Sequence, residues 1–217
     1  MAIAPDGSPV ELYLRLPPRG EAEIVHDAIP AGAEILELGC GVGRITHELV
    51  RLGHPVVAVD ESAEMLAHVR GAETVQARIE GLDVGRRFPC VLLASHLVNA
   101  EDGERDALLR TCVRHLTPEG ALVIERYEPG WVPEEGVGGG VGDVTVTMRD
   151  VRREGRRFHA VAQYDVDGQA WTQPFTAVVL DDEELDAALR RVGLTLTRTL
   201  DERGAWVEAQ FGDVAGR

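Results

Sequence analysis

Apolar residues fall in short, nearly continuous runs over the first 130 residues, and amphipathic segments separate these runs. Such runs are typical of strands buried on both faces of a parallel sheet. Segments with apolar positions three or four residues apart are typical of helices packed on that sheet. The sequence therefore predicts an α/β fold. Buried strands are expected at 34–38, 55–60, 74–77, 90–94 and 121–125.

Helices are expected between and after these strands. Ser62 is placed to cap one of them, because a serine hydroxyl can accept a hydrogen bond from the first turn of a helix. Pro17 and Pro18 predict an extended or irregular lead-in over 12–19, since proline restricts the residue before it. The expected helices are 21–29, 45–50, 61–69, 103–116 and 182–192.

The pattern changes after residue 130. The segment 136–142 is rich in glycine and is expected to be mobile. Runs with β character follow and are joined by Glu154-Gly155 and by Asp167-Gly168, the second of which is a strong hairpin signal. We expect an antiparallel insertion here and a β-hairpin at the end of the chain. The strands are expected at 144–151, 157–166, 169–180, 194–200 and 205–211.

A glycine-rich turn, with Gly39, Gly41 and Gly43, separates the first strand from the helix after it. Glycine is needed where the backbone takes a positive φ or approaches a ligand closely. Glu37 precedes this turn; an acid there would repel a pyrophosphate but suits a ligand that carries an amino group and a sulfonium. Asp60 ends the second strand, where a carboxylate can accept both hydroxyls of a ribose. A simple tight turn in an unrelated α/β protein is the alternative.

The two motifs, at this spacing, resemble the class I S-adenosylmethionine (SAM) dependent methyltransferases of the small-molecule type. The resemblance implies a Rossmann-like fold: a seven-stranded, mostly parallel sheet, a terminal β-hairpin and an antiparallel β insertion after strand 5. It implies one methyltransferase domain over 1–217. Its expected parts are an N-terminal lid and helix (1–30), a SAM-binding core (31–130), an antiparallel cap (131–180) and a C-terminal helix and hairpin (181–217).

The resemblance also implies SAM as cofactor and S-adenosylhomocysteine as product. Tyr13 is a candidate lid residue, or it packs on the first helix. Arg78 stands where the family usually has an acid that binds the adenine, so the backbone of Arg78 or Ile79 replaces that contact, or Arg78 stacks on the ring. The expected cofactor-binding residues are Tyr13, Glu37, Gly39, Cys40, Gly41, Gly43, Arg44, Asp60, Glu61, Met65, Arg78, Ile79, Ala94 and Ser95.

His96 follows the fourth strand, so we expect it at the mouth of the site. It is the candidate catalytic base; the alternative is a histidine that bonds locally or shapes the cofactor wall. Glu125 is a weaker candidate for acceptor contact, or it pairs with Arg126. Aromatic residues of the insertion either line a pocket for an apolar acceptor or form its own small core. The expected acceptor-binding residues are Asn99, Arg126, Tyr127 and Trp131.

Composition narrows the function further. The net charge is −15 and all basic residues apart from histidine are arginine, which disfavours nucleic acid as a partner. The residues suggest no metal set, and Cys40, Cys90 and Cys112 are expected in the core. No apolar run is long enough to span a membrane, and the N-terminus does not look like a signal peptide. We expect a cytoplasmic monomer or homodimer.

The leading hypothesis is a methyltransferase that acts on O, N or C of a small-molecule acceptor, with secondary metabolism as its setting. The alternative is a SAM-binding protein of the same fold that transfers no methyl group, such as a regulator or an enzyme of rearrangement. The unusual Arg78 is its support. A nucleotide-dependent oxidoreductase is a more distant third, because the glycine spacing opposes it.

Overall fold

The computed structural model describes residues 3–5 and 7–212, so the outermost residues of the expected N- and C-terminal parts lie outside the described residues. Among those described, no helix is both long and apolar enough to cross a bilayer. The elements are α1 (Val10–Tyr13), α2 (Glu21–Ala28), β1 (Ile35–Leu38), α3 (Arg44–Arg51), β2 (Val56–Asp60), α4 (Ala63–Leu66), β3 (Glu73–Gln76), β4 (Phe88–Leu93), the 3-10 turn η1 (Leu97–Asn99), α5 (Asp102–His115), β5 (Leu116–Glu125), β6 (Gly138–Val141), β7 (Val144–Glu154), β8 (Arg157–Val166), β9 (Gln169–Val178), α6 (Asp182–Arg190), β10 (Leu194–Thr199) and β11 (Trp206–Phe211).

The main sheet has seven strands in the order β10-β11-β5-β4-β1-β2-β3. Strands β1 to β5 run parallel, and β11 is antiparallel both to β5 and to β10. The predicted α/β fold, with a mostly parallel sheet and a C-terminal hairpin at its edge, is confirmed. The strand order reverses between β1 and β4, and in such sheets ligands bind outside the carboxyl ends of the strands at that point.

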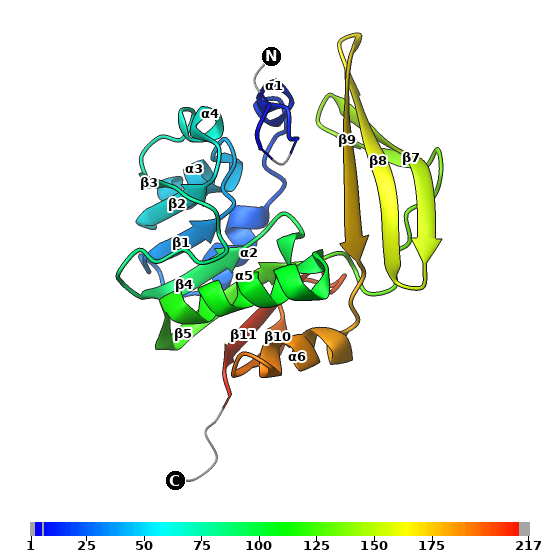
Figure 1. Ribbon diagram of the computed structural model, residues 1–217. Coiled ribbons are helices and arrows are strands. Elements are labelled where there is room, and N and C mark those ends of the chain that lie inside the picture. Colours follow the sequence, from blue (N-terminus) through cyan, green and yellow to red (C-terminus); the bar gives the residue numbers. More distant parts are fainter. Residues whose placement is uncertain (1–2, 6, 213–217) are drawn as a thin grey trace.

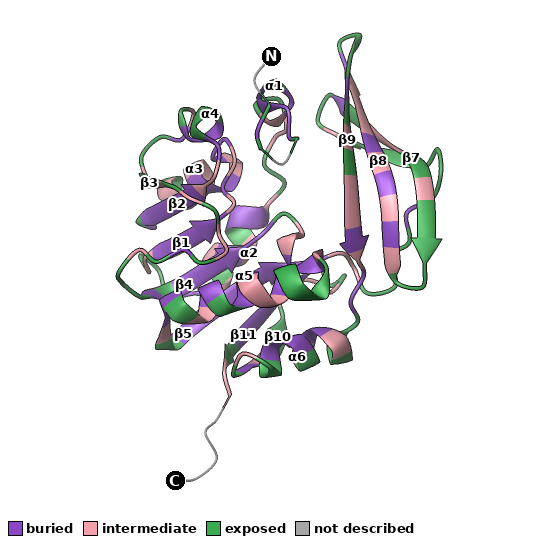
Figure 2. Ribbon diagram, in the orientation of Figure 1, coloured by how far each residue is buried: buried purple, intermediate pink, exposed green. Residues whose placement is uncertain are grey.

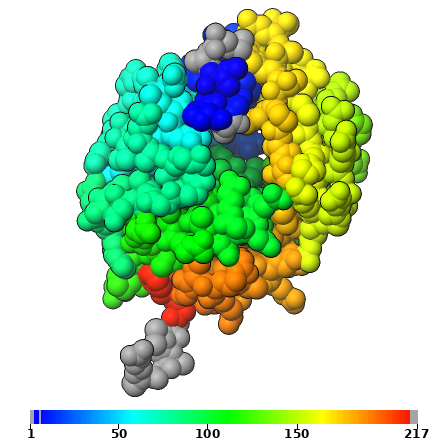
Figure 3. Space-filling model, in the orientation of Figure 1, coloured from blue at the N-terminus to red at the C-terminus, as the bar shows by residue number. Residues whose placement is uncertain are grey.

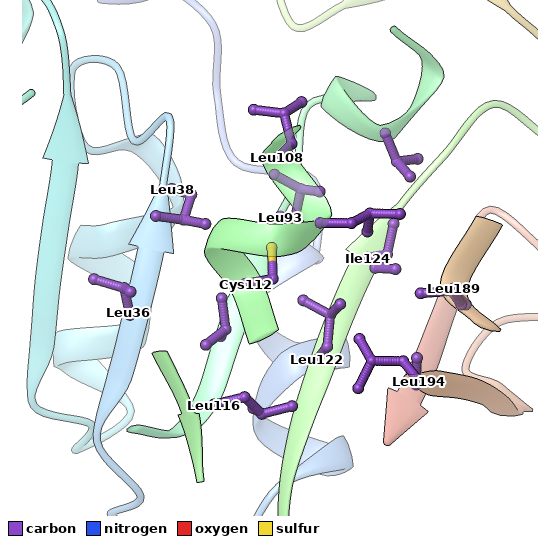
Figure 4. Close-up of a cluster of buried hydrophobic side chains, with 14 of the residues drawn as sticks. Leu36, Leu38, Leu93, Leu108, Cys112, Leu116, Leu122, Ile124, Leu189 and Leu194 are labelled. Carbon is purple, nitrogen blue, oxygen red and sulfur yellow. The ribbon is translucent and has the colours of Figure 1, made fainter. Parts of the chain in front are cut away.

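Both faces of this sheet are covered, which explains the continuous apolar runs. Helices α5 and α6 cover one face, where Leu109 and Leu189 pack with Leu38, Leu93 and Ile124 (Figures 1 and 4). Helices α2 and α3 cover the other face with a second cluster. The strands at the centre of the sheet are buried along nearly their whole length (Figure 2). Polar side chains therefore find room mainly at the strand ends.

A second, antiparallel sheet of four strands, β6-β7-β8-β9, stands beside the main sheet (Figure 1). It is the predicted insertion after β5. We call these strands, 138–178, the cap. Strand β6 forms within the glycine-rich segment for which we expected mobility. A β-carbon added at Gly138 would lie 1.9 Å from the carbonyl oxygen of Val146, so this strand approaches β7 more closely than a side chain permits.

Some boundaries differ from the prediction. We expected the fifth strand to begin at residue 121, but β5 begins at Leu116 because Leu116 already pairs with Phe88 before the strand register shifts. The lead-in to α2, expected to be extended or irregular, contains the short helix α1. Helix α4 is shorter than expected, and Ser62 caps it as predicted by accepting a hydrogen bond from the Met65 amide at 3.2 Å.

Helix α1 lies between the cap and the glycine-rich turn. Its Val10 packs with Val42 and Met65 on the main-sheet side, and its Leu12 is fully buried against Trp171 and other residues of the cap. Figure 1 shows α1 in the space between α4 and β9. The N-terminal segment thus bridges the two sheets.

Two polar side chains join the cap to the main sheet. The Asn99 amide donates to the carbonyl of Val178, the last residue of β9, at 2.7 Å, and its oxygen accepts from the Tyr127 amide at 2.9 Å. Arg126 is also buried, and its guanidinium donates to the carbonyls of Gly204 and Leu180. The two side chains thus bond to main-chain groups of the segments that lead into the cap and out of it.

Replacing Asn99 with alanine tests this connection. The change leaves a partly buried carbonyl and a partly buried amide without the partner that Asn99 supplies, so the free energy of unfolding should fall by about 1–3 kcal/mol. Thermal denaturation followed by circular dichroism measures the loss. The exposed Gln210→Ala is a control that removes a surface amide and should change the melting temperature little. An unchanged melting temperature in Asn99→Ala would contradict a structural role for this side chain.

Candidate active site

The glycine-rich turn follows β1 directly. Gly39, Gly41 and Gly43 all have positive φ angles, of 75°, 56° and 86°. A β-carbon at Gly39 would lie 2.8 Å from Leu97, whereas one at Gly41 would meet no atom within 4 Å. The backbone at Gly41 therefore borders open space, as a turn that cradles a ligand requires. Cys40 is buried between these glycines, and burial raises the pKa of its thiol, so it stays protonated.

Glu37 lies within β1 and is buried, although it is charged at high pH. One of its oxygens accepts a hydrogen bond from the Thr46 hydroxyl of α3 at 2.5 Å. Burial raises its pKa from 4.5 to about 7, and the Thr46 hydroxyl and the charge of Arg44 oppose that rise only in part. Within the described residues Glu37 forms no ion pair. A buried carboxylate of this kind is stabilised by a cationic ligand.

Asp60 ends β2 beside the turn. Its Oδ2 accepts from the Gly41 amide at 2.8 Å, and its Oδ1 accepts from the Ser62 amide at 2.9 Å. These bonds fix the carboxylate between the turn and the start of α4. Because each carboxylate oxygen has two acceptor positions, both oxygens retain capacity for ligand hydroxyls.

Arg44 begins α3, next to the turn. Its guanidinium pairs with the buried Glu21 of α2, and Arg19 lies 3.5 Å from the same carboxylate. Burial acts to raise the pKa of Glu21, but the bonds from Arg44 and from the Arg19 backbone outweigh it, so the pKa is lowered. The charge of Arg44 is thus already paired with Glu21. Its contact with the cofactor remains a prediction.

His96 follows β4, and both His96 and the residue before it have an unusual backbone conformation. Ser95 and His96 are adjacent non-glycine residues with positive φ angles, 56° and 60°. Such a conformation is strained and persists where surrounding contacts impose it. The Ser95 amide donates to Oε2 of Glu125 at 2.7 Å, and Nε2 of His96 lies 4.0 Å from Oε1 of the same carboxylate. Burial lowers the pKa of His96 below 6.5, and Glu125 opposes this only in part, so the imidazole is neutral at pH 7.

Aromatic rings extend from His96 toward the cap. His96 stacks on Tyr127 with ring centroids 4.2 Å apart, and Tyr127 stacks on Trp131 at 4.5 Å. Phe158 of β8 meets the edges of both Tyr127 and Trp131. The rings thus form a wall that runs from the end of β4 to the cap.

A hollow opens between the N-terminal segment, the main-sheet core and strand β9 (gold) in the space-filling view (Figure 3). Tyr13 lies at its N-terminal side: its hydroxyl donates to Gln173 of β9 at 3.4 Å and accepts from Ser8 at 3.3 Å. Gln173 in turn donates to Ser8 at 2.9 Å. The N-terminal segment is therefore hydrogen-bonded to the cap.

Of the remaining residues expected to contact the cofactor, some lie beside the glycine turn and one is exposed to solvent. Ile79 lies beside Gly39, and Met65 is buried between the turn and α1. Arg78 is exposed to solvent and pairs with Glu80 at 3.1 Å. Ala94 is buried at the end of β4, and Glu61 is partly buried next to Asp60.

Two of the four residues expected to contact the acceptor bond to groups of the protein instead. Asn99 and Arg126 are held by main-chain groups, and Arg126 also pairs with Asp182 of α6. Thr46, Glu21 and Leu97 border the site but were not among the expected residues. The sequence could have pointed to Thr46, because this hydroxyl residue lies nine positions after Glu37, in the helix that follows the turn.

Residues 35–120 match the family model described as a methyltransferase domain. This match supports the resemblance to the class I methyltransferases. A sugar N,N-dimethyltransferase of Streptomyces fradiae, named for dTDP-3-amino-3,6-dideoxy-alpha-D-glucopyranose, is 30% identical over 161 residues, which is 68% of this chain and 62% of that protein. Cypemycin N-terminal methyltransferase of a Streptomyces species is 33% identical over 106 residues, 45% of this chain and 43% of that protein. This chain therefore spans less than two thirds of the length of these relatives.

Solved structures agree with the fold of this chain. The CcbJ methyltransferase from Streptomyces caelestis superimposes with a TM-score of 0.76 at 20% identity, covering 94% of this chain and 96% of that one. The SAM-bound amino pentose methyltransferase CalS10 from Micromonospora echinaspora gives 0.68 at 23% identity, covering 88% of each chain. Both likenesses extend over the cap as well as the main sheet.

Glu37→Gln tests the burial of this carboxyl. A pKa that folding raises from 4.5 to about 7 contributes stability that is fully present below pH 4.5 and is lost as the pH rises toward 7. Glutamine carries no charge, so the variant should gain over the parent by ~5 °C in melting temperature between pH 5.5 and pH 8. Differential scanning calorimetry without ligand measures this.

The control for this experiment is Glu73→Gln, an acid of β3 whose side chain is 61% exposed. Its difference from the parent should stay constant across the same pH range. A Glu37→Gln difference that is equally independent of pH would show that Glu37 is ionised at little cost in the folded protein.

Proposed function

We propose that this chain is a SAM-dependent methyltransferase that transfers a methyl group to O, N or C of a small-molecule acceptor. The observation that carries the proposal is the set of Glu37 in β1, Asp60 at the end of β2 and the open backbone at Gly41, which lie at one edge of the sheet next to the strand-order reversal. Glu37 is a buried carboxylate without an ion pair among the described residues, and it fits a ligand that carries positive charge.

The fit of SAM to these residues is chemical. Its cationic amino-acid end suits Glu37, and its ribose hydroxyls suit the fixed carboxylate of Asp60. The bound cofactor supplies an electrophilic methyl group on a sulfonium. The chain then has to orient the acceptor and exclude water, and such positioning can lower a barrier by roughly 7–11 kcal/mol.

The acceptor side of the site is formed by His96 and the stacked rings of Tyr127 and Trp131. Neutral His96 is the proposed base, because it can accept a proton at physiological pH. Tyr13 and the N-terminal segment are the proposed lid, and the cap is proposed to close over the acceptor. The aromatic wall favours a small molecule with an apolar face.

The relatives support a small-molecule acceptor, since the two matched proteins are named for a nucleotide-linked amino sugar and for cypemycin. The alternative of SAM binding without transfer rested on Arg78, and that side chain is exposed and paired with Glu80. A nucleic-acid partner stays disfavoured by the charge of −15. One functional unit over 1–217, a cytoplasmic location and a monomeric or homodimeric state remain our predictions.

Isothermal titration calorimetry tests the cofactor. SAM and S-adenosylhomocysteine should bind with micromolar or tighter dissociation constants, and NAD should not bind. Incubation with SAM and a panel of amino and hydroxy acceptors, followed by mass spectrometry, should give S-adenosylhomocysteine together with products heavier by one methylene. Tight NAD binding without SAM binding would refute the proposed function.

Asp60→Ala should weaken SAM binding by about 1–3 kcal/mol, because the ribose hydroxyls lose their acceptor. The same titration measures this change. Asp60 also binds two main-chain amides, so the matched control is Asp83→Ala, an exposed aspartate whose Oδ1 accepts from the Gly85 amide at 2.8 Å. SAM affinity should be normal in that control. Equal SAM affinity in the parent and in Asp60→Ala would remove Asp60 from the cofactor site.

A further inference from the structure

Glu125 is the last residue of β5, and its side chain is 7% exposed. It lies between β4 on one side of β5 and β11 on the other, where it pairs with Trp206. Its Oε2 accepts the main-chain N–H of Ser95 at 2.7 Å. One oxygen of this carboxylate therefore holds the strained turn that carries His96.

The other oxygen of Glu125 has a different environment. Oε1 lies 4.0 Å from Nε2 of His96, which is too long for a direct hydrogen bond. No donor from the described part of the chain reaches Oε1 within hydrogen-bond distance. A third atom can lie about 2.9 Å from both Oε1 and Nε2, the ordinary hydrogen-bond length. The two side chains thus border a position for one polar atom of a ligand.

Charge restricts what that atom is. The nearest arginine in sequence, Arg126, directs its guanidinium to Gly204, Leu180 and Asp182, and Arg44 pairs with Glu21. Glu125 is thus left without an arginine partner among the described residues. A buried carboxylate without a cation is costly. Glu37 and Asp60 add further negative charge at the same edge of the sheet. The position suits a cationic nitrogen better than a neutral hydroxyl.

We propose that Glu125 selects and orients an amine acceptor, with the acceptor nitrogen bound between Glu125 Oε1 and His96 Nε2. This inference rests on the proposed methyl transfer and narrows its acceptor to an amine. The nitrogen arrives as an ammonium ion and gives one proton to Nε2 of the unprotonated His96 imidazole. Its freed electron pair then forms the bond to the methyl carbon while the carbon–sulfur bond breaks and leaves its pair on sulfur. The products are S-adenosylhomocysteine, a methylated ammonium ion and a protonated His96, which releases its proton to solvent before the next cycle.

Sinefungin tests this without knowledge of the natural acceptor. It has the framework of SAM but carries an amino-bearing carbon in place of the methyl-bearing sulfur, so it presents an ammonium group at the position of the transferred methyl. Titration calorimetry should show sinefungin binding to the parent about 10- to 100-fold more tightly than S-adenosylhomocysteine, as a hydrogen bond to a charged group predicts. Glu125→Gln should remove most of this preference and leave the affinity for S-adenosylhomocysteine within about twofold, because a glutamine oxygen still accepts the Ser95 amide.

Glu128→Gln is the matched control. Glu128 lies three residues further along, is 42% exposed and pairs with Arg203 at 3.2 Å, so its loss removes one nearby negative charge without touching the proposed position. The ratio of the two affinities should equal that of the parent. A parent that binds S-adenosylhomocysteine but does not prefer sinefungin, or a preference that Glu125→Gln retains, overturns this inference alone. A parent that binds neither compound overturns the proposed function and the inference with it.

Discussion

The central constraint on this molecule is that both faces of its parallel sheet are covered by helices. Along β1, β2 and β4 nearly every side chain is buried, so polar groups gather where the strands end. Glu37 is the exception, a carboxyl inside β1 that is held by one threonine hydroxyl. This carboxyl lies next to the glycine turn, at the edge of the sheet where a cationic ligand would offset its charge. The remaining features of the site, from Asp60 to Glu125, surround this edge.

The cap extends the site in a second direction. The rings of His96, Tyr127, Trp131 and Phe158 connect the end of β4 to β8 through direct ring contacts. Because Asn99 binds both the end of β9 and the start of this aromatic segment, the cap is fixed to the sheet at the base of the rings. The aromatic wall and the attachment of the cap to the sheet therefore share residues of the same short segment.

Local sequence was enough to predict the fold and the glycine turn beside Asp60. The glycines and Asp60 belong to motifs of a few residues, and apolar runs identify buried strands. The acceptor side depends on residues distant in the chain, and sequence could not place those. Arg126 and Asn99 follow strands as ligand-binding residues do, yet their partners lie 28 to 79 residues away in the chain. Strand β6 consists mainly of glycines, and its pairing with β7 depends on close backbone approach rather than on any β-forming side chain.

Helix α1 is buried on two of its sides. Its Val10 is buried on the side of the glycine turn, and its Leu12 is buried on the side of the cap. If this short helix moves away from the glycine turn or from the cap, Val10 or Leu12 becomes exposed to solvent. Exposure of either apolar side chain is unfavourable, so the packed position is favoured. Helix α1 is therefore held between the two sheets by apolar contacts on both of its sides, and moving it away from either sheet costs hydrophobic burial.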